Sequence, residues 1–250
     1  MSYLDQTLLF IISLAANIFS AFAGGGAGLI QFPALIFLGL PFGLALATHK
    51  VASVALGVGA TLRFLRGDKL SLKLMLVILS FGLPGVVLGA NVIIFVADRH
   101  AEILLGILTT SLGCYSIFKP DLGIEARHLP LNATKILGGG LVLFIIGVLN
   151  GSLTSGTGLF VTLWLVGYFG LDYKTAVAHT LVMVGLFWNG VGALTLGLLV
   201  QIQWQWLPAL LFGSLLGGYF GAHLAIIKAN KWIKRSFEFV TIVVGISLLF

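Results

Sequence analysis

The sequence predicts an all-helical, polytopic membrane protein. Hydrophobic residues make up 59% of its 250 residues and charged residues only 9%, and the mean hydropathy is +1.11. Soluble domains carry about 25% charged residues and need far more polar surface to cover a core of this size. The apolar residues form long runs and lack the alternating ~10-residue pattern of an outer-membrane barrel, so we interpret the runs as helices.

Ten apolar segments follow one another along the chain. A full helical span needs about 20 residues, and segments 51–64 and 159–170 are shorter than that. Glycines split the first segment from the second and the sixth from the seventh, so each of these pairs is either two spans or a re-entrant hairpin. The predicted segments are 7–23, 29–47, 51–64, 72–96, 103–118, 136–152, 159–170, 177–199, 207–227 and 232–250.

The two halves of the chain repeat each other at a spacing of about 130 residues. The stretch Gly26–Ile30 recurs as Gly156–Phe160, and His49 recurs as His179. A glycine-interrupted apolar segment at the same place in both halves points to the substrate site of a secondary transporter. The repeat continues downstream in the pairs Phe81-Gly82 with Phe212-Gly213, and Gly89-Ala90-Asn91 with Gly221-Ala222-His223.

The repeat divides the chain into two membrane halves. We expect a first membrane repeat over residues 1–118, a polar cytoplasmic linker over 119–135 and a second membrane repeat over 136–250. Neither half satisfies its buried polar groups alone, so we expect the two halves to form one structural unit.

Basic loops set the expected orientation in the membrane. Cytoplasmic loops carry an excess of Lys and Arg, and two basic stretches lie an even number of segments apart, so both are placed inside. The repeat partner of the first stretch is the uncharged loop 199–203, which is placed outside. Matching loops on opposite sides indicate two inverted-topology repeats, with both termini outside. The basic residues are Arg63, Arg66, Lys69, Lys73, Lys228, Lys231, Lys234 and Arg235.

The glycine breaks are the strongest candidates for a substrate site. Each glycine costs about 1 kcal/mol relative to alanine in a helix, so residues 23–28 and 150–158 are expected to interrupt their segments. A broken helix frees backbone N–H groups, and the next half-helix begins there with its positive dipole end, which favours an anion. Close helix packing through small residues is the alternative. The predicted contact residues are Gly25, Gly26, Gly28, Asn150, Thr154, Ser155, Gly156, Thr157 and Gly158.

Two histidines stand downstream of the breaks. His49 and His179 are each expected to begin an apolar helix after a short polar break. An ionisable residue inside a membrane is functional by default, whereas one at a segment end also suits the membrane interface or a helix cap. Lys50 either offsets the charge of an anionic substrate or extends to the headgroups. Ser53 shares the helix face of His49, and Thr180 completes the predicted substrate-binding set.

Other kinds of chemistry are disfavoured. The glycine clusters lack the GxxxxGK[ST] motif of ATP-driven transport, and no Ser–His or paired-carboxylate set suggests an enzyme. Two histidines without a third matching ligand do not make a zinc site, and the single cysteine, Cys114, excludes an intrachain disulfide. We expect no cofactor, no metal and no nucleic acid. Asn17, Gln31 and Asn189 either tie helices together or meet a substrate.

Five stretches form an ordered pattern along the chain: Gly24–Ile30 with Pro33, Ala47–Ser53, Thr154–Gly158, Ala178–Thr180, and the helix with Gly82, Pro84, Gly85 and Gly89. Taken in order, these motifs resemble the sulfite exporter TauE/SafE family over nearly the whole chain. The resemblance implies a bacterial or archaeal inner-membrane carrier of small sulfur-containing or organic anions, such as sulfite, sulfoacetate or related sulfonates. It also implies a pseudo-symmetric fold of two repeats.

The sequence therefore predicts a secondary transporter of a small anion that works by alternating access, with the substrate near the membrane midplane between the two breaks. A channel for anions or small neutral solutes on the same repeat is the alternative. The expected partners are the anionic substrate and the lipid bilayer. A coupling proton or ion and a homodimer are left open.

Overall fold

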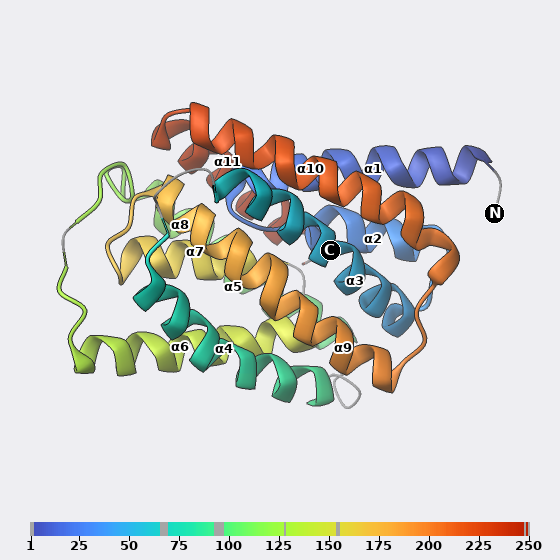
Figure 1. The fold of residues 1–250 in the computed structure, drawn as a ribbon, viewed down its shortest axis with the longest axis horizontal. Coiled ribbons are helices and arrows are strands. Elements are labelled where there is room, and N and C mark those ends of the chain that lie inside the picture. The colour runs from blue at the N-terminus through green and yellow to red at the C-terminus, as the bar shows by residue number, and fades with distance from the viewer. Residues whose placement is uncertain are drawn as a thin grey trace.

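The computed structural model describes residues 3–65, 70–92, 98–127, 129–153, 156–247 and 249. Every regular element in this part of the chain is a helix, which confirms the predicted all-helical fold (Figure 1). Within it, six helices are long and apolar enough to cross a membrane. They are Tyr3–Ala23 (α1), Phe42–Phe64 (α3), Leu72–Val92 (α4), Ala133–Leu153 (α6), Tyr173–Leu199 (α8 Tyr173–Thr180, the π-helical η2 Leu181–Trp188 and α9 Asn189–Leu199) and Trp204–Ile227 (η3 Trp204–Trp206 and α10 Leu207–Ile227).

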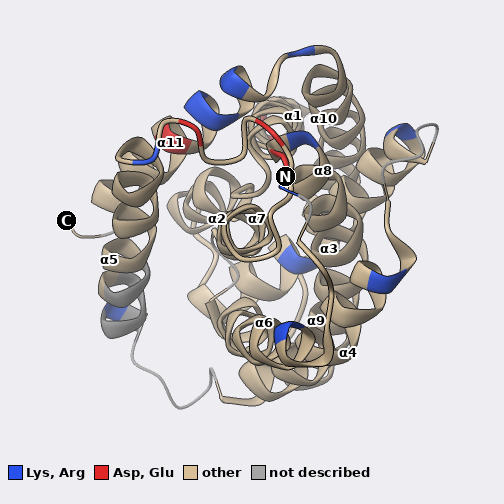
Figure 2. Ribbon diagram, turned by 90° about the vertical axis from the view of Figure 1, so that its left-hand side faces the viewer, with Lys and Arg blue, Asp and Glu red and all other residues tan. Residues whose placement is uncertain are grey.

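Four further helices complete the described fold. α5 (Asp98–Ile117) and α11 (Asn230–Ser247) pack against each other at one side of the molecule (Figure 2). α2 (Gly28–Phe37) and α7 (Thr157–Gly167) have only 10 and 11 residues. At 1.5 Å per residue, each is roughly 15 Å long, about half the thickness of the hydrocarbon core. Each glycine-split pair is therefore one long helix followed by a half-helix.

The two half-helices lie at the centre of the molecule and point toward each other. α2 and α7 follow one line in Figure 1, and in Figure 2 they are seen end-on inside a ring of other helices. Their N-terminal ends meet: a methyl group added at Gly25 would lie 2.6 Å from the carbonyl carbon of Gly158 and 2.7 Å from the nitrogen of Leu159. The two glycine breaks, far apart in sequence, are therefore one place in the fold.

Glycine-rich faces hold the long helices together in two pairs. α1 packs along α10, and α4 packs along α6. A methyl group added to α10 at Gly217 would lie 2.7 Å from the carbonyl oxygen of Leu14 on α1, and one added to α4 at Gly85 or Gly89 would collide with the backbone of α6. Small residues at helix contacts let membrane helices approach closely. The downstream part of the sequence repeat therefore serves helix packing.

The packing partners exchange between the two halves. α1, the first long helix of the first half, packs on α10 of the second half, and α6, the first long helix of the second half, packs on α4 of the first half. α4 and α10 also occupy matching positions in the repeat. The helices that follow the half-helices, α3 and the span containing η2, cross at Gly57 and Gly185. A two-fold relation between the halves would produce this pattern. The inverted orientation of the halves in a membrane stays a prediction.

Loops that were placed together on the cytoplasmic side gather at one end of the molecule. Lys73, at the start of α4, donates to the carbonyl oxygen of Leu131 in the linker at 3.0 Å. Asn230, at the start of α11, also donates to the linker. Figure 2 looks onto this end and shows Lys and Arg on the loops and helix ends around α2 and α7. Arg66 and Lys69 lie outside the described residues.

The prediction that the two histidines begin helices is wrong. α3 is continuous, and the turn before it lies at residues 38–41, so the boundary between the predicted segments 29–47 and 51–64 is misplaced. The hydroxyl of Thr48 donates at 2.7 Å to a carbonyl one turn earlier in α3, so the polar run continues the helix instead of breaking it. Likewise, α8 continues through η2 into α9, and His179 lies inside a span of 27 residues.

Candidate functional site

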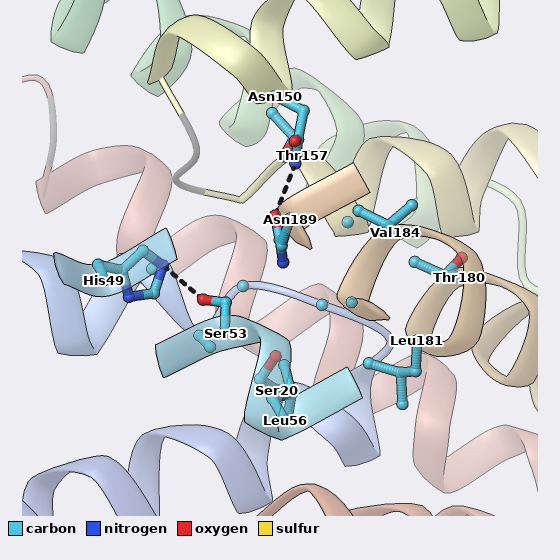
Figure 3. A pocket seen from close by; sticks show the side chains of 16 residues that line it. Ser20, His49, Ser53, Leu56, Asn150, Thr157, Thr180, Leu181, Val184 and Asn189 are labelled. Carbon is cyan, nitrogen blue, oxygen red and sulfur yellow. Dashed lines mark hydrogen bonds between the residues drawn. The ribbon is translucent and has the colours of Figure 1, made fainter. Parts of the chain in front are cut away.

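A small buried cavity lies where the N-terminal ends of α2 and α7 meet (Figure 3). The centres of water-sized molecules can reach about 30 Å³ of it, which is room for one or two waters. Backbone of residues 25–28 and Gly158 forms one part of the wall, and apolar side chains from α3 and η2 form another. The polar side chains in the wall are Ser20 (α1), His49 and Ser53 (α3), Asn150 (α6), Thr157 (α7), Thr180 (α8) and Asn189 (α9).

The structure brings most of the predicted site residues to this cavity. Lys50, Gly156 and His179 lie outside the lining, and Thr154 and Ser155 fall outside the described residues. Contact of any of these residues with a substrate stays a prediction. The predicted residues that line the cavity are Gly25, Gly26, Gly28, His49, Ser53, Asn150, Thr157, Gly158 and Thr180.

The first break exposes backbone donors because of its glycine conformations. Gly24, Gly25 and Gly26 have φ values of +93°, +137° and +96°, which side-chain-bearing residues rarely adopt. This turn leaves the N–H groups of Gly26 and Ala27 without an acceptor among the residues that the structure describes. Both groups border the cavity, so they are available to a ligand.

The electrostatics of the cavity favour negative charge. A helix N-terminus carries roughly half a positive charge, and two such ends face this one space. Its polar side chains are hydroxyls, amides and one imidazole, with no carboxylate among the described lining residues. Within the described part of the chain, no three His, Cys, Asp or Glu side chains come together as metal ligands would. The arrangement can bind an oxyanion through converging N–H and O–H donors.

Ser20 and Asn189 are wall residues that the predicted site does not contain. Ser20 is 2% exposed, and its Oγ has no hydrogen-bond partner among the described residues, although buried hydroxyls normally have one. A signal for it existed, because Ser20 precedes the first break at the position where Asn150 precedes the second, 130 residues later. No comparable signal marks Asn189, which reaches the cavity only through the packing of α9.

Lys50 stands directly behind the cavity wall. Its side chain is buried, and Nζ donates to the backbone oxygen of Asn150 at 2.7 Å, to Asn150 Oδ1 at 2.8 Å and to Asn189 Oδ1 at 3.2 Å. Of the two readings of Lys50 left open by the sequence, the structure therefore excludes extension to the headgroups. The lysine organises two amides of the wall.

His49 connects the cavity to a buried polar network. One ring nitrogen, Nε2, lies 3.1 Å from Ser53 Oγ, as their shared helix face predicts, and the other, Nδ1, lies 2.8 Å from Gln31 Oε1. Gln31 Nε2 donates to Ser13 Oγ at 2.8 Å. Asn17 joins the same cluster by donating to the backbone oxygen of Ser13 at 2.6 Å. Gln31 therefore ties α2 to α1 and α3. Asn17 also donates to Ser214 Oγ at 3.0 Å and so ties α1 to α10. Both residues link helices, as one of their two readings expected.

The two histidines have different roles, because the residues that match in the structure are offset by one position from the residues that match in the sequence. Thr162 on α7 donates to Thr180 at 2.9 Å across the same 18-residue interval that separates Gln31 from His49. The structural counterpart of His49 is thus Thr180. His179 instead accepts from the backbone N–H of Ser71 at 2.9 Å through Nε2, and its Nδ1 lies 2.8 Å from a carbonyl oxygen of α8.

The partner of His179 in the repeat is therefore Thr48. Thr48 Oγ1 accepts from the backbone N–H of Gln203 at 2.9 Å, just as His179 accepts from Ser71. Both side chains hold the loop that leads into the next long helix of the opposite half. Nε2 of His179 thus holds this loop, and Nδ1 contacts a carbonyl oxygen of its own helix. Both ring nitrogens therefore have partners outside the cavity.

Comparison with known proteins agrees with the architecture. A family model described as sulfite exporter TauE/SafE matches residues 9–248. A probable membrane transporter protein of Haemophilus influenzae is 33% identical over 228 residues, which cover 91% of this chain and 88% of that protein. The probable membrane transporter protein YfcA of Escherichia coli K12 is 28% identical over 246 residues, with 97% and 89% covered.

More distant similarity extends to Bacillus subtilis, where the probable membrane transporter protein YdhB is 24% identical over 251 residues and is covered in full. No solved structure matches the chain. The family match spans nearly the whole chain and confirms the resemblance seen in its motifs. The chain therefore belongs to the sulfite exporter TauE/SafE family and is a multi-pass membrane transporter.

Proposed function

We propose that this protein is a secondary transporter of a small anion, sulfur-containing or organic, such as sulfite, sulfoacetate or a similar sulfonate. The observation that carries the proposal is the meeting of two half-helix N-termini at one buried cavity with hydroxyl and amide walls. Oxyanions are the ligands that such converging donors and dipoles favour. The name of the matching family supports sulfite or a related anion as the first substrates to test.

The anion would take its hydrogen bonds from three sources. Backbone N–H groups of Gly26 and Ala27 lack acceptors in the described chain, the hydroxyl of Ser20 has no partner there, and the amide nitrogen of Asn189 points into the cavity (Figure 3). Thr154 and Ser155 remain proposed contacts on the second break. Lys50 supplies positive charge from behind the wall, and His49 supplies a polar edge beside Ser53.

The burial of the residues that line the cavity supports an alternating-access mechanism. His49, Asn150 and Thr180 are each at most 2% exposed, so a substrate reaches them only when helices move. Two repeats of inverted topology, one per half, would give the inward-open and outward-open forms by rocking about the site. We place the protein in a bacterial or archaeal inner membrane, as a monomer or a homodimer, with the basic end shown in Figure 2 in the cytoplasm.

A thermal-shift screen of the purified protein in detergent tests the anion site. The panel contains sulfite, sulfate, thiosulfate, sulfoacetate, taurine, acetate and dicarboxylates, and a ligand that binds the folded state raises its stability by mass action. Ser20→Ala removes a hydroxyl that has no partner in the described chain, so we expect unchanged stability without ligand. With an anion bound, Ser20→Ala loses one hydrogen bond to a charged group, which is worth about 1.5–3 kcal/mol. We therefore expect the variant to bind the anion roughly 10–100-fold more weakly than the parent protein.

The matched control is Ser111→Ala, because Ser111 lies on α5 outside the cavity and its hydroxyl donates to the carbonyl oxygen of Ile107 in the same helix. This variant should bind anions as the parent protein does. Absence of a shift with every anion in the panel would contradict the proposed function. Flux in proteoliposomes then separates the two transport classes: saturation and counterflow indicate a carrier, whereas flux that never saturates indicates the channel alternative.

A further inference from the structure

The three hydrogen bonds of Lys50 match the protonated form of its side chain. An ammonium group has three N–H donors, whereas a neutral amine has two donors and a lone pair. Lys50 Nζ meets three oxygens, of which two are the amide oxygens of Asn150 and Asn189. The surroundings of Nζ can therefore accommodate the ammonium form.

The ammonium also sets which way the two amides face. With both amide oxygens turned to Lys50, Asn150 Nδ2 donates to Thr157 Oγ1 at 2.8 Å. The nitrogen of Asn189 points into the cavity (Figure 3). A protonated lysine thus leaves the amide donor of Asn189 facing the cavity and keeps both amide oxygens turned away from it. This polarity suits an anion and disfavours a ligand that must donate.

No carboxylate faces this ammonium from the elements packed around it, within the residues that the structure describes. α6 contributes Asn150, and α9 contributes Asn189 and Gly192, whose missing side chain leaves space for the lysine stem. α4 contributes Val86, which approaches Gly192 on the same side.

The titratable groups nearest in the fold do not supply a negative charge either. The neighbouring residue, His49, contacts Gln31 and Ser53 through its two ring nitrogens. The lysines of α4 and α6, Lys73 and Lys135, stand at the starts of those helices, more than ten residues from the part of each helix that approaches Lys50. A charged Lys50 therefore has no carboxylate counterion among the residues that the structure describes.

An ion held away from water without a counterion is strongly disfavoured, and such groups neutralise instead. An anion in the cavity would offset that cost, because Asn150 and Asn189 line the cavity and also contact Lys50 Nζ. We infer that Lys50 carries a coupling proton, so that the anion and a proton bind together and cross the membrane together. The empty site holds the neutral amine, and the loaded site holds the ammonium with its anion.

The proton balance of this step is simple. A proton from water adds to the lone pair of Lys50 Nζ as the anion enters, no covalent bond to the anion forms, and both are released on the other side. A monoanion then crosses with no net charge. The inference rests on the proposed anion site and adds proton symport to it.

Proton uptake on binding tests the inference with the full-length protein. The purified protein is mixed with sulfoacetate in weakly buffered detergent solution near neutral pH, where both acid groups of this probe stay ionised, and the pH change is recorded. Sulfite is measured in the same way against a protein-free blank, because sulfite takes up protons itself. We expect one proton taken up per anion bound.

Four variants locate the proton. Lys50→Met removes the amine and should abolish proton uptake, and Lys50→Arg should bind the anion without uptake, because arginine stays charged. Lys73→Met, a lysine at a helix end far from the cavity, is the matched control and should take up protons as the parent does. His49→Gln tests the neighbouring imidazole and should retain uptake whenever it binds the anion.

The outcomes separate this inference from the proposed function. Anion binding by the parent protein without proton uptake overturns the inference and leaves the anion site standing, and this holds even if the Lys50 variants fail to fold. Uptake that survives in Lys50→Met, or that disappears in a His49→Gln protein that still binds, also overturns it. No binding of any anion overturns the proposed function and the inference with it.

Discussion

Gly25→Ala should be one of the most destabilising single changes in this chain. At Gly25, φ is +137°, and an added methyl group would lie 2.6 Å from the carbonyl carbon of Gly158. The left-handed backbone costs a side-chain-bearing residue about 1–2 kcal/mol, and overpacking against a rigid wall costs about 1–3 kcal/mol. Backbone forms the wall here, and it cannot rotate aside as a side chain would. Together these effects predict a loss of roughly 2–5 kcal/mol.

Two other glycines separate the strain from the collision. Gly39 has φ +96° but no atom within 4 Å of an added methyl group, so Gly39→Ala should cost only the backbone strain of about 1–2 kcal/mol. Gly190 has a helical backbone and an equally open surrounding, so Gly190→Ala should gain up to about 1 kcal/mol of helix propensity.

Thermal unfolding in detergent measures this series. For a chain of this size, each kcal/mol moves Tm by roughly 2–4 °C. We therefore expect Tm to fall by roughly 4–20 °C in Gly25→Ala and by roughly 2–8 °C in Gly39→Ala, and to rise by at most about 4 °C in Gly190→Ala. Equal Tm values for the Gly25 and Gly39 variants would refute the reasoning, because they would show that the two half-helix ends do not touch.

Two further predictions separate the histidines. His179→Ala removes the acceptor of the Ser71 N–H and should lower stability by about 1 kcal/mol, as loss of a helix cap does; anion-induced thermal shifts that vanish in this variant would contradict the capping role. His49→Ala changes the cavity wall and should abolish anion flux in proteoliposomes while the protein remains folded. The double variant with His179→Ala should likewise show no flux. Full residual flux would argue against a role for His49 in transport.

Much of the fold can be predicted from the sequence, because the lipid environment restricts which backbone structures each segment can form. Backbone polar groups in a bilayer must be satisfied within the segment, so apolar length alone identifies helices. Glycines at 24–28 and 156–158 predict breaks because no side chain there stabilises a helix. The lengths of the half-helices α2 and α7 are harder to predict, because the apolar runs do not coincide with them. The run 29–47 continues beyond the end of α2, and the run 159–170 begins and ends later than α7.

The polar run Thr48-His49-Lys50 shows where local reasoning fails. In an apolar segment such a run predicts a helix end, since burying it unpaired is expensive. α3 nevertheless continues through it, because each side chain finds its partner on another element: Thr48 meets Gln203, His49 meets Gln31, and Lys50 meets two asparagines. The same one-residue shift that gives His179 the role of Thr48 is invisible to a motif comparison.

The sequence alone predicts the membrane class, the family and most of the residues at the cavity, and it contains the duplicated motifs. These follow from composition, from glycine conformational freedom and from motif order, all of which act over short stretches of chain. Three features come from the packing of the helices: the two breaks meet end to end, Ser20 and Asn189 belong to the wall, and Lys50 bonds residues 100 and 139 positions away. Such contacts depend on how helices pack across the two halves, and no local pattern encodes that packing.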